Sequence, residues 1–232
     1  MNILSNSLRL LREWLRFAFV TLLLFLLIRG FVLEAFTIPT SSMEETLLVG
    51  DFLFVNKALY GAEIPGTRAR LPAVRDPVRG DVVVFRPPHD RERVYVKRVV
   101  GLPGDTLEMR HKLLVLNGEP QEEEYAHHLD NRGDAVHPDM KWQGDYLVAA
   151  EPVWTYHPSR DNWGPLVVPA GRFFVLGDNR DNSEDSRYWG FIRREDITGR
   201  PWLVYLSLRN SSGSSGGWIR RVRWNRVGRI VR

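Results

Sequence analysis

The stretch VYVKRVVGLPGD, residues 94–105, decides the fold class of this chain. Its first seven residues are mostly valine and tyrosine, which favour strands, and the glycines and proline that follow mark a turn. Asn117 and Gly118, after another apolar run, predict a tight hairpin turn. Many short strands with little helical periodicity predict a mainly β fold, built as an antiparallel β-rich domain. The other β-rich runs lie at residues 51–55, 81–85, 113–116, 172–176 and 201–208.

Length and composition limit the classes of protein that this sequence can encode. A chain of 232 residues has room for a membrane anchor and one soluble unit with a sizeable core. Hydrophobic residues make up 44% and charged residues 26%, which indicates a folded rather than a disordered chain. Because the chain has no cysteine, disulfides, a cysteine nucleophile and thiolate metal sites are excluded.

Arginine is concentrated at the C-terminal end, although the formal net charge is only +4. An arginine-rich strand or a contact with anionic lipid fits this segment better than nucleic acid, which we do not expect as a partner. The segment also holds Trp218 and Trp224, and its arginines are Arg220, Arg221, Arg223, Arg226, Arg229 and Arg232.

The N-terminal region predicts one membrane-spanning helix. Residues 17–28 are apolar apart from Thr21, and by themselves would also suit the core of a signal peptide or a buried helix. Flanking apolar residues extend the stretch, so that a helix from Leu10 to Leu33 would run roughly 36 Å and cross a bilayer core. No small-residue cleavage motif follows closely, which argues against removal of the segment.

Charge predicts the orientation of this helix. Arg9, Arg12 and Arg16 precede the apolar stretch, and Arg29 alone lies near its end. The positive charge on the N-terminal side predicts that this side is cytoplasmic. The alternative is a buried amphipathic helix of a soluble protein. We expect three parts: a cytoplasmic basic segment at residues 1–13, a transmembrane anchor at 14–33 and an extracytoplasmic domain at 34–232.

A hydroxyl-rich turn shortly after this helix supplies a candidate nucleophile. The segment IPTSSMEETL, residues 38–47, carries two serines and two threonines after a proline. A serine hydroxyl is a poor nucleophile until a neighbouring base takes its proton. Taken alone, Ser42 would be a turn residue or a helix N-cap. With a base beside it, Ser42 would be a nucleophile at the bilayer surface.

Histidine is the usual base for a serine nucleophile, and the chain has six. None stands in a recognisable setting, but triad members need not be neighbours in sequence, so a Ser-His-Asp triad stays open. The adjacent His127 and His128 have no spaced partner motif, so we expect a solvated loop there rather than a metal site. The other histidines are His89, His111, His137 and His157.

Lysine is the other candidate base, provided that a dry pocket keeps its amine neutral. Lys97 suits this requirement, because strand alternation puts it on one face with Tyr95 and Val99. An isolated lysine in a strand is normally solvated. Lys97 therefore becomes a candidate only in combination with the segments around it.

Four segments along the chain carry recognisable motifs. They are PTSSM at 39–43 with TL at 46–47, RGDVVVF at 79–85, YVKRVVGLPGD at 95–105, and GDNRDNS at 177–183 continued by DSRYWG at 185–190. In this order the segments resemble the type I bacterial signal peptidases, membrane-anchored serine proteases that remove signal peptides from exported proteins. The last two segments are long and specific. With the anchor, the resemblance covers residues of about 14–118 and 170–232.

The resemblance implies roles for individual residues. Ser42 resembles the nucleophile and Lys97 the general base. The backbone N–H of Ser42 and the hydroxyl of Thr40 resemble an oxyanion hole, whose donors stabilise a developing alkoxide. Ser183 matches a serine that hydrogen-bonds to the lysine and orients it.

Further residues match supporting and substrate-binding positions. Asp185 and Arg187 match an ion pair, and their spacing would put both on one side of an extended segment. Six residues resemble the walls of small pockets that accept an Ala-x-Ala sequence: Ile38, Pro39, Met43, Leu47, Tyr95 and Val96.

The implied function is a membrane-anchored serine endopeptidase that removes signal peptides from exported preproteins after Ala-x-Ala-like sites. Its expected location is the inner or plasma membrane of a bacterium, with a single membrane pass. The expected partners are signal peptides and the phospholipid bilayer, with the protein export machinery as a candidate. No metal or organic cofactor is expected.

The chain departs from the family pattern at two positions and in one region. Glu45 stands where the family usually has proline, which removes a φ-fixing residue and adds a charge, and Ser41 stands where glycine is frequent. Residues 119–165 match no family motif, and we expect them to form an inserted smaller subdomain or a long excursion from the β domain.

Two other functional classes stay open. One is a related Ser/Lys enzyme that cleaves itself or another target, although the anchor argues against a soluble form of it. The other is a non-catalytic β scaffold tethered to the membrane. The combination of Ser42, Lys97 and Ser183 argues against the scaffold.

Overall fold

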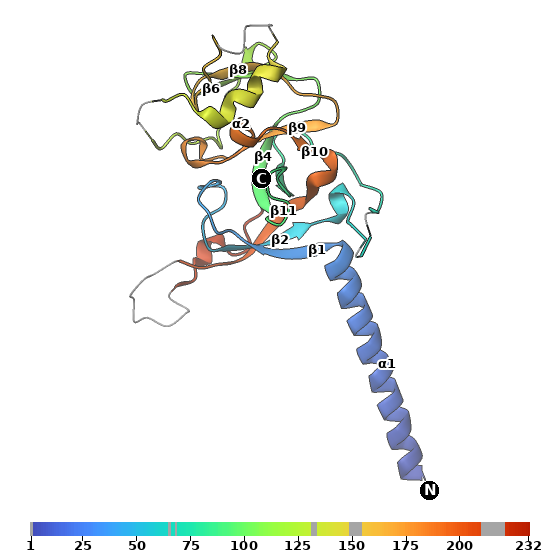
Figure 1. Ribbon diagram of the computed structural model, residues 1–232. Coiled ribbons are helices and arrows are strands. Elements are labelled where there is room, and N and C mark those ends of the chain that lie inside the picture. The colour runs from blue at the N-terminus through green and yellow to red at the C-terminus, as the bar shows by residue number, and fades with distance from the viewer. Residues whose placement is uncertain (1, 65, 68, 131–133, 149–154, 210–220) are drawn as a thin grey trace.

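A long N-terminal helix stands away from a β-rich body in the computed structural model (Figure 1). The structure describes residues 2–64, 66–67, 69–130, 134–148, 155–209 and 221–232. The helix, α1, spans Asn2–Phe31 and leads directly into the first strand.

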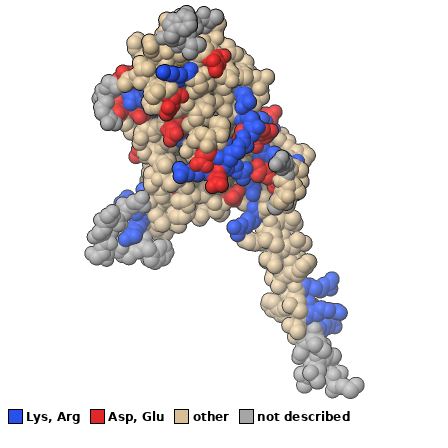
Figure 2. Space-filling model, viewed as in Figure 1, with Lys and Arg blue, Asp and Glu red and all other residues tan. Residues whose placement is uncertain are grey.

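The segment Arg9–Phe31 of α1 is long and apolar enough to cross a membrane, and none of it is buried by the rest of the protein. Its 23 residues correspond to about 34 Å of helix. Large apolar side chains such as Trp14 and Phe25 are exposed, and a helix that is apolar all round needs a core or lipid around it. Figure 2 shows basic side chains gathered toward the N-terminal end of α1 and an uncharged length between them and the body. The expected apolar helix is therefore confirmed.

The larger of two sheets has seven strands in the order β1-β2-β11-β3-β4-β9-β10, and all neighbours are antiparallel. β1 lies at one edge of the sheet, and β4 lies between β3 and β9. Figure 1 labels β1, β4 and β9. The strands are β1 (Leu33–Thr37), β2 (Asp51–Asn56), β3 (Val82–Phe85), β4 (Tyr95–Gly101), β9 (Arg172–Leu176), β10 (Ile192–Arg193) and β11 (Ile197–Ser207).

The smaller sheet has four strands in the order β7-β6-β5-β8, again antiparallel. The expected hairpin turn joins β6 to β7, with Asn117 at φ 52° and Gly118 at φ 86°. The predicted fold class, mainly antiparallel β, is confirmed. The strands are β5 (Thr106–Arg110), β6 (Leu113–Leu116), β7 (Glu119–Pro120) and β8 (Trp163–Val167).

Short helices lie in the connections between the strands, and η7 follows the last strand. The described part of residues 119–165 contributes η2, whose Met140 is wholly buried in the core of the smaller sheet beside Trp163 and Phe174. The short helices are η1 (Ala58–Tyr60), η2 (Pro138–Tyr146), η4 (Arg180–Asn182), α2 (Ser186–Trp189), η5 (Arg194–Asp196) and η7 (Trp224–Arg226).

β4 is the strand that positions the site. All four residues of β3 beside it are buried, and so are Lys97 and Arg98 within it. Lys97 pairs in register with Val83 of β3, and Arg98 pairs with Leu176 of β9. Because side chains alternate along a strand, these two cations point to opposite faces of the sheet. Each cation therefore needs its own partners inside the protein.

Candidate active site

The side chains of Ser42 and Lys97 meet inside the protein. Ser42 lies on the turn that follows β1 and Pro39, and Lys97 lies at the middle of β4. The Lys97 amine donates a hydrogen bond of 2.5 Å to the Ser42 hydroxyl. The exposed fraction is only 4% for Lys97 and 9% for Ser42. An amine in this position can take the proton of the hydroxyl once the amine itself is neutral.

Burial lowers the pKa of Lys97 from 10.5 to about 8. The negative charge of Asp185 opposes this change and the positive charge of Arg187 reinforces it. Burial dominates because an ammonium loses its hydration in the protein interior. Burial is also the cause from which the sequence analysis expected a lowered pKa, and a neutral Lys97 acting as a base stays a prediction.

The segment after β9 holds residues 38–47 in place; we call these residues the nucleophile turn, after the role that the resemblance implies for Ser42. The Asn179 backbone N–H donates to the Ser42 carbonyl oxygen at 3.2 Å. The Asn182 amide donates to the Ser41 hydroxyl at 2.9 Å. Gly177 is required for this close approach, because a Cβ there would lie 2.5 Å from the Ser42 carbonyl oxygen. The hydroxyl of Ser41, at a position where glycine is frequent in the family pattern, is thus hydrogen-bonded to Asn182.

Two hydrogen-bond donors lie beside the Ser42 hydroxyl. The Thr40 hydroxyl oxygen is 3.5 Å from the Ser42 hydroxyl oxygen. Within the described part of the chain, the Ser42 backbone N–H has no acceptor. Both groups are thus available to an oxygen that develops negative charge near Ser42.

Asp185 and Arg187 form a wholly buried ion pair, joined by two bonds of 2.8 Å. The expected pairing is present, but the expected extended backbone is wrong. Asp185 caps the N-terminus of α2, and Arg187 lies in the first turn of that helix. Burial alone would raise the pKa of Asp185, but the charge and hydrogen bonds of Arg187 hold that pKa below its usual range. Asp185 is therefore ionised and already neutralised by Arg187, which limits its pull on Lys97.

Ser183 is buried beside Gly177, and a Cβ on Gly177 would lie 2.2 Å from its hydroxyl oxygen. Its hydroxyl makes no hydrogen bond to any residue that the structure describes. The orientation of Lys97 by Ser183 stays a prediction.

A groove of about 560 Å³ opens beside the Ser42–Lys97 pair. Five of the six predicted wall residues line it: Ile38, Pro39, Met43, Tyr95 and Val96. Leu47 does not, because it is fully buried in the core beneath the turn. The sequence analysis missed other lining residues, although Asn182 lies in the GDNRDNS segment and Glu184 follows it directly. These residues are Phe36, Thr37, Arg93, Val94, Asn182 and Glu184.

No histidine in the described part of the chain lies within hydrogen-bonding distance of the Ser42 hydroxyl. Among the described residues, the Ser42 hydroxyl has polar contacts only with Lys97 and Thr40, and no histidine lines the groove. His127 instead contacts the carboxylate of Glu45 at 3.0 Å. The described residues contain no cluster of side chains that could hold a metal ion.

The backbone conformation at Glu45 is incompatible with the proline that the family pattern has at this position. Its φ is 70°, in the left-handed region, whereas a proline ring holds φ near −65°. The turn therefore takes a backbone path at this position that proline could not adopt. The contact with His127 ties it to residues 119–130.

A family model described as "Signal peptidase, peptidase S26" matches residues 11–206. This chain belongs to the signal peptidase family. The chain is 37% identical to the signal peptidase I of Pseudomonas aeruginosa, over 87% of this chain and 75% of that protein. It is 34% identical to the signal peptidase I of Rickettsia massiliae, over 93% of this chain and 91% of that protein. The crystal structure of a signal peptidase I from Enterococcus faecalis V583 matches with a TM-score of 0.37 and 30% identity, over 55% of this chain and 98% of that one.

Membership of the signal peptidase family confirms the predicted enzyme class, a serine endopeptidase. The alternative of a non-catalytic scaffold is thereby wrong.

We expect kcat/KM of this signal peptidase family member to rise with pH through a group whose pKa is about 8. Because burial lowers the pKa of Lys97, the amine holds its proton below this pH and is free to accept one above it. Lys97→Arg should be inactive, since a guanidinium stays protonated. The measurement is the pH dependence of preprotein cleavage in detergent. An acidic limb that moved with a histidine substitution, or an active Lys97→Arg, would assign the base elsewhere.

Proposed function

We propose that this chain removes N-terminal signal peptides from exported preproteins, with Ser42 as nucleophile and neutral Lys97 as general base. The observation that carries the proposal is the 2.5 Å hydrogen bond between the Lys97 amine and the Ser42 hydroxyl. Both residues line the groove. Family membership supports the same reading, because the relatives are named signal peptidase I.

In this mechanism the Ser42 oxygen attacks the carbonyl carbon of the scissile bond while Lys97 takes the hydroxyl proton. The oxyanion accepts hydrogen bonds from the Ser42 N–H and the Thr40 hydroxyl. The Lys97 ammonium then gives its proton to the departing amine of the mature protein. Lys97, neutral again, takes a proton from a water molecule, whose oxygen attacks the ester carbonyl carbon on Ser42. The Lys97 ammonium then returns this proton to the departing Ser42 oxygen, and the signal peptide leaves with a free carboxyl group.

An edge strand and a groove with apolar lining residues support our proposal for the substrate class. β1 ends the larger sheet, so an extended peptide can pair with its free edge. Alternate side chains of that peptide would then face the groove residues such as Ile38, Met43 and Val96. We propose that these pockets accept the small side chains of an Ala-x-Ala-like site.

We further propose a single-pass topology in a bacterial inner or plasma membrane. Residues 1–13 would be cytoplasmic, residues 14–33 would anchor the chain in the bilayer and residues 34–232 would form the extracytoplasmic protease domain. The exposed apolar length of α1 supports the anchor, and Arg9, Arg12 and Arg16 support the orientation.

Ser42→Ala should abolish cleavage of a preprotein while the protein stays folded, because the hydroxyl's role is covalent. Thr40→Ala should lose one oxyanion donor and about 10²–10³ in kcat. Thr40→Ser should keep much of the activity, since its hydroxyl remains. The readout is initial cleavage rate together with thermal unfolding of each variant. Wild-type activity in Thr40→Ala would place the oxyanion donors elsewhere.

Cleavage should require small residues at the first and third positions before the scissile bond. A preprotein series with Ala, Leu and Phe at each position tests this, with product N-termini mapped by sequencing. We expect Phe at either position to block cleavage, because the proposed pockets accept only small side chains. Indifference to side-chain size would sink the substrate assignment.

Protease added to right-side-out vesicles should degrade the chain beyond residue 34 and spare a short N-terminal fragment. The reason is the charge on the N-terminal side of α1. The same treatment of inverted vesicles is the control, and there the domain should survive. Protection of the domain in right-side-out vesicles would reverse the proposed topology.

A further inference from the structure

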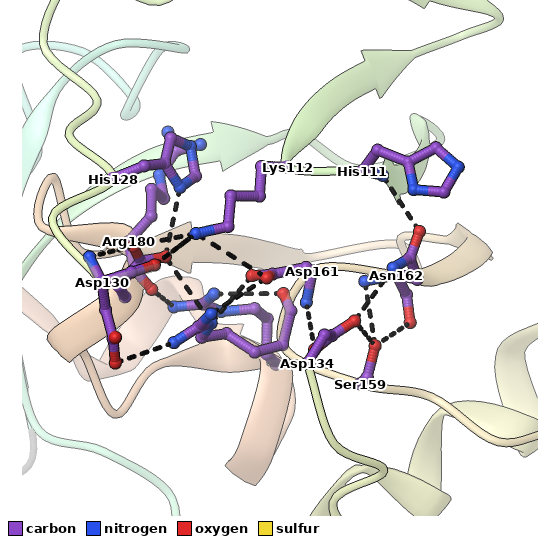
Figure 3. Close-up of polar contacts among 12 residues, drawn as sticks. His111, Lys112, His128, Asp130, Asp134, Ser159, Asp161, Asn162 and Arg180 are labelled. Carbon is purple, nitrogen blue, oxygen red and sulfur yellow. Dashed lines mark hydrogen bonds and ion pairs between the residues drawn. The ribbon is translucent and has the colours of Figure 1, made fainter. Parts of the chain in front are cut away.

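Asp181 is a buried carboxylate on which several distant segments converge. It lies in η4, and its side chain is 1% exposed. It accepts a hydrogen bond from the Lys112 amine at 3.1 Å and one from the Asp130 backbone N–H at 2.8 Å. His128 and Arg160 also approach it, at 3.2 and 3.5 Å. Figure 3 shows the Lys112 side chain reaching from its turn into this network.

The other side of η4 faces the nucleophile turn. Asn179, its N-terminal neighbour, binds the Ser42 carbonyl oxygen, and the Asn182 amide binds the Ser41 hydroxyl. Ser183 follows directly and is buried. Residues 179–183 therefore contact the nucleophile turn on one side and the Asp181 network on the other.

Lys112 binds Asp181 although its own backbone is in the left-handed region, which is unfavourable for lysine. It lies with His111 in the turn between β5 and β6, where φ is 70° for Lys112 and 50° for His111. Asn and Gly are the residues that such a turn favours. Non-glycine residues stay in this region only where their surroundings hold them, and such residues gather at functional sites. Here the Lys112 amine binds Asp181 and also the Asp130 carbonyl oxygen at 2.8 Å.

We propose that Lys112 is a positioning residue for the peptidase reaction. Through Asp181, its ammonium holds η4, and with it Asn182 and Ser183, against the nucleophile turn. The inference rests on the proposed function for its kinetic consequence, but the contact itself can be tested without a substrate.

Lys112→Asn separates positioning from turn stability, because asparagine favours the left-handed backbone but cannot carry the cation to Asp181. We expect kcat to fall about tenfold with KM little changed, since small misplacements of reacting groups slow chemistry. Lys112→Arg keeps the charge and should restore most of the rate. Lys141→Asn is the matched control, because Lys141 is exposed and makes no polar contact with the described residues. It should behave as wild type.

The pH profile separates positioning from a long-range charge effect. Loosening η4 would admit water to Lys97 and raise its pKa. The acidic limb of the kcat/KM profile should therefore move to higher pH in Lys112→Asn and also in Asp181→Asn. A through-space charge effect alone would move the two variants in opposite directions, because one removes a cation and the other an anion. Opposite shifts would overturn the proposal.

Amide hydrogen exchange in the full-length protein in detergent provides the substrate-free test. We expect faster exchange at residues 179–183 and 40–44 in Lys112→Asn than in wild type or Lys141→Asn. Unchanged exchange there overturns the proposal, as does wild-type kcat in Lys112→Asn or a loss that arginine fails to restore. Wild type and Ser42→Ala run in the same cleavage assay, so failure of the proposed function would show as wild type without activity.

Discussion

The proposed site depends on the exclusion of water from the Lys97 amine. In water this amine would stay protonated at neutral pH. The lysine lies on β4, between two strands, with 4% of its surface exposed. Burying an ammonium costs free energy, so the neutral form is favoured. A nearby unpaired carboxylate would reverse that effect. Asp185 is instead joined to Arg187, which is why its charge only moderates the fall of the Lys97 pKa to about 8.

The second cation of β4 performs a structural task on the opposite face of the sheet. Arg98 binds both carboxylate oxygens of Asp178, at 2.8 and 2.6 Å. Asp178 also accepts a hydrogen bond of 2.6 Å from the Thr46 hydroxyl, at the far end of the nucleophile turn. One strand thus carries the proposed base, Lys97, and fixes the nucleophile turn through a buried ion pair. Losing either partner of such a pair leaves an uncompensated buried charge, so the site depends on both.

Two residues that depart from the family pattern, Ser41 and Glu45, make contacts that hold the nucleophile turn. Ser41 supplies a hydroxyl to Asn182, and Glu45 adopts a left-handed φ and meets His127. Both contacts come from segments far away in sequence. Side-chain contacts of Ser41 and Glu45 therefore help to fix the conformation of this turn.

The sequence by itself determined the mainly β class, the apolar N-terminal helix, the hairpin at Asn117-Gly118 and the pair Ser42 and Lys97. Local signals suffice for these features, because turn chemistry, strand alternation and family motifs are written in neighbouring residues. Tertiary structure decided the rest. It placed Leu47 in the core instead of the groove, put Asp185 at the start of α2, and brought Lys112 to Asp181. Such contacts join residues far apart in sequence, and only the packing of the folded chain determines which side chains become neighbours.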